Sequence, residues 1–184
     1  MEPVEYKPSY AQTSMTYGAM FAVVASLVFY GILVFSMSSG NPGILGFVIA
    51  CLGCLGIIFL PGIFSVKSFL KQTNGKLLIG KGAVIGLVSG AAFGVVYGFM
   101  DLVWLLAGVD TATMFMDYML AISENYGGNT GQVDEMREMM EAQSRTGGTI
   151  LIGVLTNVVI YSIVNLLSGM LAVSIWADTS SDEF

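Results

Sequence analysis

Three long stretches of the chain contain no charged residue, and they restrict the possible folds more than any other feature of the sequence. They cover residues 8–66, 82–100 and 146–177, and they are 59, 19 and 32 residues long. A helix needs about 20 apolar residues to cross the hydrocarbon core of a bilayer, which is about 30 Å thick. The first stretch is long enough for two crossings, so the sequence predicts an integral membrane protein.

The composition agrees with this prediction, because 55% of the 184 residues are hydrophobic and only 11% are charged. Soluble proteins average about 25% charged residues. Asn41-Pro42-Gly43 has the chemistry of a tight turn and divides the first stretch in two. We expect an all-α integral membrane protein in which one domain contains four transmembrane helices. The predicted spans are residues 16–37, 44–64, 82–107 and 149–177, and Pro61 falls near the end of the second.

The lysines predict the orientation of the chain in the membrane. The link between the second and third spans carries Lys67, Lys71, Lys76 and Lys81 and no acidic residue. Short basic loops stay in the cytoplasm, so both termini are expected on the cytoplasmic side of the inner (plasma) membrane. The first fifteen residues lack the basic start of a signal peptide, and the first span is therefore expected to remain as an uncleaved anchor.

The connector between the third and fourth spans, residues 108–148, is then external. It holds seven acidic residues and two arginines. Nucleic acid and anionic headgroups reward basic surfaces, so neither is an expected partner of this segment. Apolar side chains recur on one face of residues 110–122 and again of residues 133–143, with a glycine-rich turn between them. We expect two short amphipathic helices on or near the outer membrane surface.

Five glycines recur at four-residue steps along the third span: Gly82, Gly86, Gly90, Gly94 and Gly98. Glycine allows membrane helices to bring their backbones close together, so these residues predict a surface for helix packing. Four residues turn a helix by about 400°, and the glycines therefore drift by about 40° at each step. From this drift we expect the first two and the last two glycines to contact different helices.

From Phe69 onward, about two thirds of the chain resembles a four-span bacterial membrane family known only as a domain of unknown function. The resemblance rests on the basic link with Asn74-Gly75, the glycine-rich third span, the Met136-Arg137-Glu138-Met139-Met140 segment of the connector and the final span. It implies a fold and a membrane location, and no activity.

Asp101 is the one ionisable residue inside a predicted span, and such residues are candidates for function. The fourth span carries Asn157, Tyr161 and Asn165 at four-residue intervals. At 1.5 Å per residue, Asp101 lies about 9 Å and Asn157 about 12 Å from the outer ends of their spans. We expect a hydrogen bond from Asp101 to Asn157 or Tyr161. Such a contact either holds two helices together, which is the preferred interpretation, or belongs to a proton or ion pathway.

The remaining candidates for chemistry have simpler structural explanations. Cys51 and Cys54 have the spacing of a thiol redox site, but cysteine in mid-membrane packs as a small hydrophobic residue. The chain has twelve methionines and no histidine, so we expect no metal site, no cofactor and no catalytic residue. The predicted function is a non-enzymatic membrane scaffold or accessory subunit, whose partners are the lipid bilayer and a homo-oligomer or larger complex. The alternatives are a small transporter or channel that uses Asp101 and, less favoured, a thiol-redox enzyme.

Overall fold

The structure, a computed structural model, describes residues 9–38, 44–125 and 147–177, together with Gly131, Glu135 and Glu138. All regular elements in this part of the chain are α-helices, as predicted. They are α1 (Tyr10–Ser38), α2 (Ile44–Gln72), α3 (Ile79–Leu106), α4 (Thr111–Asn125) and α6 (Gly147–Trp176).

Four of these helices, α1, α2, α3 and α6, are long and apolar enough to cross a membrane. They contain 29, 29, 28 and 30 residues. At 1.5 Å per residue they measure about 42 to 45 Å, the thickness of a bilayer with its headgroup regions. The chain is therefore a multi-pass membrane protein, and the prediction of four spans is confirmed at this level.

The helix ends differ from the predicted ones. α1 begins at Tyr10 instead of residue 16, and α2 continues to Gln72 instead of ending at residue 64. The last turns of α2 contain Lys67 and Lys71. Long lysine side chains reach water while their stems lie along the helix, so a charge does not end the helix there. As a result Pro61 lies in the interior of α2, while its place near the end of the membrane span stays a prediction.

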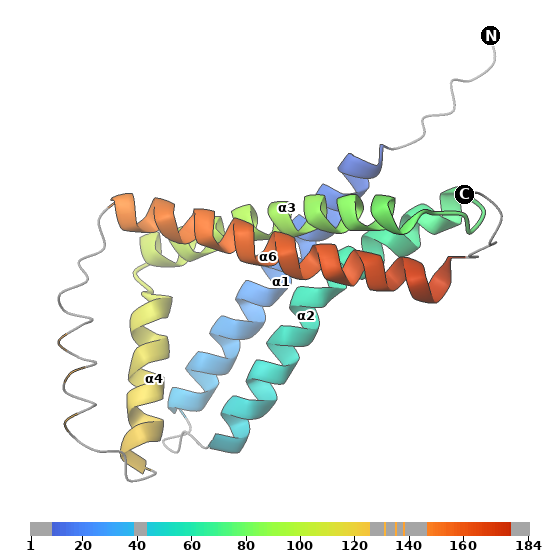
Figure 1. The fold of residues 1–184 in the computed structure, drawn as a ribbon. Helices are drawn as coiled ribbons and strands as arrows, with labels where there is room; N and C mark the ends of the chain where they lie inside the picture. Colours follow the sequence, from blue (N-terminus) through green and yellow to red (C-terminus); the bar gives the residue numbers. More distant parts are fainter. Residues whose placement is uncertain are drawn as a thin grey trace.

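α3 and α6 run side by side along most of their length (Figure 1). α1 and α2 form a second pair, which leaves the α3–α6 pair at an angle (Figure 1). A tight turn joins α2 to α3: Asn74 and Gly75 have φ values of 51° and 82°, and the Gly75 N–H donates to the carbonyl of Leu70 at 3.0 Å. This turn places the start of α3 next to the end of α2.

α4 occupies the first part of the predicted connector and turns away from the α3 axis (Figure 1). The Asp110 carboxylate accepts hydrogen bonds from the N–H groups of Ala112 and Thr113 at 3.2 and 3.1 Å, and so caps the helix. The apolar face of α4 packs on α1, where Tyr118 is buried together with Leu33. The second predicted amphipathic helix, residues 133–143, lies outside the described ranges apart from two isolated residues.

Candidate functional site: polar and close-packed contacts between the membrane helices

The five glycines of α3, which we call the glycine seam, are all buried. A Cβ atom added at Gly94 would lie 2.6 Å from Val158 Cα and 2.8 Å from the carbonyl oxygen of Asn157. One added at Gly98 would lie 2.7 Å from Val154 Cγ2. These separations are shorter than van der Waals contact. At Gly94 the obstacle is the α6 backbone, and at Gly98 it is mainly the side chain of Val154.

All five seam glycines face α6, and the expectation that the first and last pairs contact different helices is wrong. Gly82 faces Gly169 and Val173, Gly86 faces Asn165, and Gly90 faces Tyr161. Each four-residue step along α3 is thus matched by a step of about four residues in the opposite direction along α6. The expectation assumed a straight neighbour. Because the helices wrap around each other, they follow the drift of the glycines, and a repeat longer than 3.6 residues favours right-handed wrapping.

A second close approach lies on another side of α3, where it meets α1. A Cβ added at Gly18 would lie 3.0 Å from Ala92 Cβ and 3.1 Å from the Phe93 nitrogen, and it would collide with the carbonyl oxygen of Ser89. Phe93 itself is fully buried with Ala22 and Ala25 of α1. α3 is therefore held between α1 and α6.

The side chain of Asn165 joins α6 to α2. Its Oδ1 accepts a hydrogen bond from the Gly62 N–H at 2.8 Å, and its Nδ2 donates to the carbonyls of Ile58 at 3.1 Å and Tyr161 at 3.0 Å. The Gly62 N–H and the Ile58 carbonyl are the donor and acceptor that a regular α-helix would pair. The amide of Asn165 thus binds both the donor and the acceptor of one such backbone pair in α2. We call this arrangement the Asn165 clasp.

Pro61 lies directly before Gly62 and weakens this part of α2. Proline has no N–H to donate to the carbonyl of Ile57, and its ring crowds that carbonyl. In lipid, each unsatisfied backbone group costs several kcal/mol, so a neighbouring helix must supply the partners. Gly62 makes this possible, because a Cβ there would lie 2.7 Å from the carbonyl oxygen of Asn165. Asn165 is 0% exposed. The four-residue polar pattern pointed to Asn165 but did not reveal its partner.

A second group of polar residues, the Asp101 cluster, consists of Tyr97 and Asp101 on α3 and Tyr161 on α6. Asp101 interacts electrostatically with both tyrosines, and Cys54 of α2 does so as well. The two tyrosine rings are 5.7 Å apart. Side chains of a helix lean toward its N-terminus, which for Tyr161 is the end of α6 where Asp101 lies. A hydrogen bond between the Tyr161 hydroxyl and the Asp101 carboxylate stays a prediction, whereas their proximity is a feature of the structure.

Asn157 does not lie at the level of Asp101, and that expectation is wrong. The Asn157 carbonyl lies beside Gly94, seven residues before Asp101 on α3. Seven residues correspond to about 10 Å along the helix. The error arose because depth was counted from the predicted helix ends, whereas the close packing of the glycine seam sets the register of the two helices.

A third polar contact, between α3 and α1, was not predicted. The Trp104 Nε1–H donates to Ser26 Oγ at 2.8 Å, and the indole stacks on Tyr30 with 4.3 Å between ring centroids. A signal was available in the sequence: an indole N–H inside a span needs an acceptor, and serine is one of the few candidates there.

The cysteine pair cannot be located, because the Cys51 side chain lies outside the described residues. Cys54 is half-buried. In the described ranges no three His, Cys, Asp or Glu residues are grouped so that they could hold a metal ion. Comparisons with models of protein families, with curated protein sequences and with solved structures find no match to this chain. The resemblance to the four-span family stays a prediction.

Proposed function

We propose that the protein is a non-enzymatic integral membrane module, either a scaffold or an accessory subunit of a larger assembly. The observation that carries this proposal is the Asn165 clasp, in which a fully buried amide binds the backbone of a neighbouring helix. The buried polar residues of the described ranges are all uncharged: Ser14, Ser26, Ser65, Ser89, Thr111, Asn165 and Ser168. Uncharged groups of this kind support helix packing in membranes more than they support acid–base or transport chemistry.

The glycine seam supports the same function, since α3 and α6 pack closely along its whole length. The outward faces of α6 carry large exposed apolar side chains such as Leu155, Val159 and Ile163. Lipid tails or the apolar helices of a partner suit these faces. A homo-oligomer or a larger complex in the inner membrane is therefore the expected setting of this module.

A small transporter or channel is the second candidate, and the Asp101 cluster favours it. Asp101 lies with Tyr97 and Tyr161, and a carboxylate near two phenols inside a membrane could relay protons. One carboxylate is little for coupled transport, which usually uses several ion-binding groups, so we rank this function below the first.

Substitution of Asp101 distinguishes the two functions. For a scaffold, Asp101→Asn should leave thermal stability unchanged, because an amide can still hydrogen-bond, and Asp101→Leu should destabilise by roughly 1 to 2 kcal/mol. Proteoliposomes with the wild-type protein should show no more proton or cation flux than empty liposomes. Asp117→Asn, on the exposed surface of α4, is the matched control. Flux in the wild type that Asp101→Asn abolishes, with stability intact, would replace the scaffold with a transporter.

The orientation can be tested by labelling single cysteines with a reagent that does not cross membranes. In a variant without Cys51 and Cys54, a cysteine at position 123 of α4 should react in intact cells, and one at position 68 near the lysine link should react only after lysis. The opposite result, with labelling at position 68 alone, would show that the chain is inserted the other way round.

A further inference from the structure

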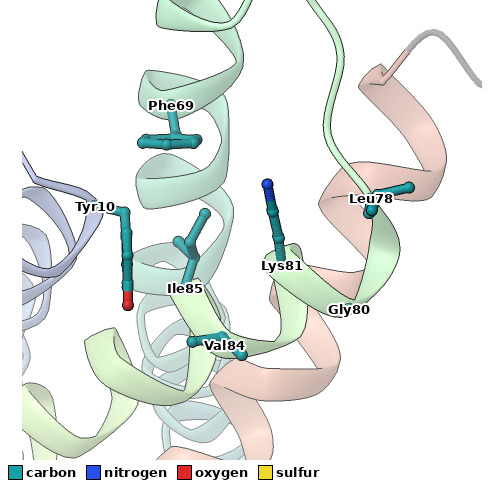
Figure 2. A pocket seen from close by; sticks show the side chains of 7 residues that line it. All are labelled: Tyr10, Phe69, Leu78, Gly80, Lys81, Val84 and Ile85. Carbon is teal, nitrogen blue, oxygen red and sulfur yellow. The ribbon is translucent and has the colours of Figure 1, made fainter.

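A groove of about 600 Å³ opens where the start of α1, the end of α2 and the start of α3 meet (Figure 2). Its volume is within the range of about 300 to 1,000 Å³ that small-molecule sites occupy. The residues that line it are Tyr10, Phe69, Leu78, Gly80, Lys81, Val84 and Ile85.

The walls of the groove are almost entirely apolar. The Tyr10 and Phe69 rings meet edge to face, with centroids 6.4 Å apart and planes at 89°. Ile85 is buried, whereas Val84 is 49% and Leu78 71% exposed, so the groove is closed on one side and open to the surroundings on the other. An apolar surface of this kind, on a protein whose outer faces meet lipid, suits a hydrocarbon chain.

One cationic side chain, Lys81, lines this apolar space. Figure 2 shows Lys81 and Leu78 on one side of the groove and Tyr10 and Phe69 on the other. The segment from Lys67 to Lys81 has four lysines and no acidic residue, so the link between α2 and α3 is basic. The N-terminus of α3 adds the positive end of its helix dipole at the same place. Lys67 differs from Lys81 in that its amine lies 5.4 Å from the centre of the Trp176 ring.

We propose that the groove binds an anionic phospholipid of the leaflet on the lysine-bearing side, with one acyl chain along Val84 and Ile85 and the phosphate at Lys81. The apolar walls of the groove and its lysine favour an anionic lipid over two other possible ligands. A soluble anion would leave the apolar walls in contact with water, and a zwitterionic lipid would gain little from the excess of lysines. Basic pockets between membrane helices on the cytoplasmic side are known to hold anionic headgroups in this way. This inference does not depend on the proposed scaffold function.

The headgroup contact can be tested by native mass spectrometry of the full chain from nanodiscs that contain equal amounts of phosphatidylglycerol and phosphatidylcholine. The wild type should retain phosphatidylglycerol in preference. Lys81→Gln should weaken this retention about fivefold, the effect of one lysine near a charged surface. Lys76→Gln, an exposed lysine outside the groove, should change it much less. Equal losses in both variants, or no preference in the wild type, would overturn the proposal of a defined site.

The acyl-chain contact needs a second pair of variants on α3. Val84→Trp should fill the groove and remove most of the retained phosphatidylglycerol, whereas Leu87→Trp, exposed to a similar extent and outside the groove, should keep it. Thermal unfolding of both variants shows whether the fold is intact. Unchanged retention in a folded Val84→Trp protein would mean that the lipid binds elsewhere. Release of the lipid by glycerol phosphate alone would mean that the site recognises a soluble anion.

Discussion

Gly94→Leu should separate α3 from α6 and lower the free energy of unfolding by at least about 3 kcal/mol, the upper end of the usual cost of overpacking. At this position the obstacle is the α6 backbone itself, since even a Cβ would come within 2.8 Å of three backbone atoms of Asn157 and Val158. A backbone cannot change rotamer to make room, so the helices must move apart. The measurement is thermal unfolding in mild detergent, with size-exclusion chromatography to detect association.

Gly153→Leu is the matched control for this experiment. Gly153 also lies in a membrane helix, but a Cβ there would have no atom within 4 Å. We expect Gly153→Leu to keep the unfolding temperature and the elution volume of the wild type, and Gly94→Ala to fall between the two leucine variants. Equal unfolding temperatures for Gly94→Leu and Gly153→Leu would show that the glycine seam does not hold the fold together.

Asn165→Leu should have the second largest effect, a loss of about 2 to 4 kcal/mol. Interhelical hydrogen bonds in membranes contribute only about 0.6 kcal/mol on average, but here the substitution also leaves the Gly62 N–H and the Ile58 carbonyl without their partner. Asn157→Leu on the same helix is the control, and we expect it to cost less than about 1 kcal/mol because that side chain is only half-buried.

The dependence of the Asn165 clasp on Pro61 can be measured with a double-mutant cycle. Pro61→Ala restores an N–H that can donate to the carbonyl of Ile57 and removes the ring that crowds this turn, so α2 should depend less on Asn165. In that background Asn165→Leu should cost at least about 1 kcal/mol less than in the wild type, and the difference is the coupling between the two residues. Additive effects would contradict the idea that the amide of Asn165 supports the turn of α2 around Pro61.

The number and class of the helices could be predicted because each depends on local composition. A stretch without charge must be helical in lipid, where all backbone groups need partners within the segment. The ends of the helices could not be predicted in the same way. α1 begins before the predicted start because Ser14 and Thr16 satisfy their hydroxyls on the carbonyls of Tyr10 and Gln12, which keeps polar residues compatible with a helix.

The residues of the candidate site could be predicted from the sequence, but the contacts between them could not. The polar pattern of the fourth span identified Asn165, but its partners depend on how closely α6 can approach Gly62 of α2. This approach is a property of the packed bundle. The glycine pattern predicted a close approach, whereas the identity of the neighbour depended on the wrapping of two helices that are far apart in the chain.

Gly82 of α3 and Gly169 of α6 face each other but lie far apart along the chain, and this separation has a consequence during synthesis. Gly169 follows Gly82 by 87 residues, so at about 5 to 20 residues per second a ribosome completes the second side roughly 4 to 17 s after the first. During this interval the glycines of α3 have no α6 to pack against, whereas Gly18 of α1, which packs on α3, has already been synthesised. The nascent chain therefore passes through an intermediate in which α1, α2 and α3 are present and the glycine face of α3 is uncovered. Synthesis of α6 then covers this face.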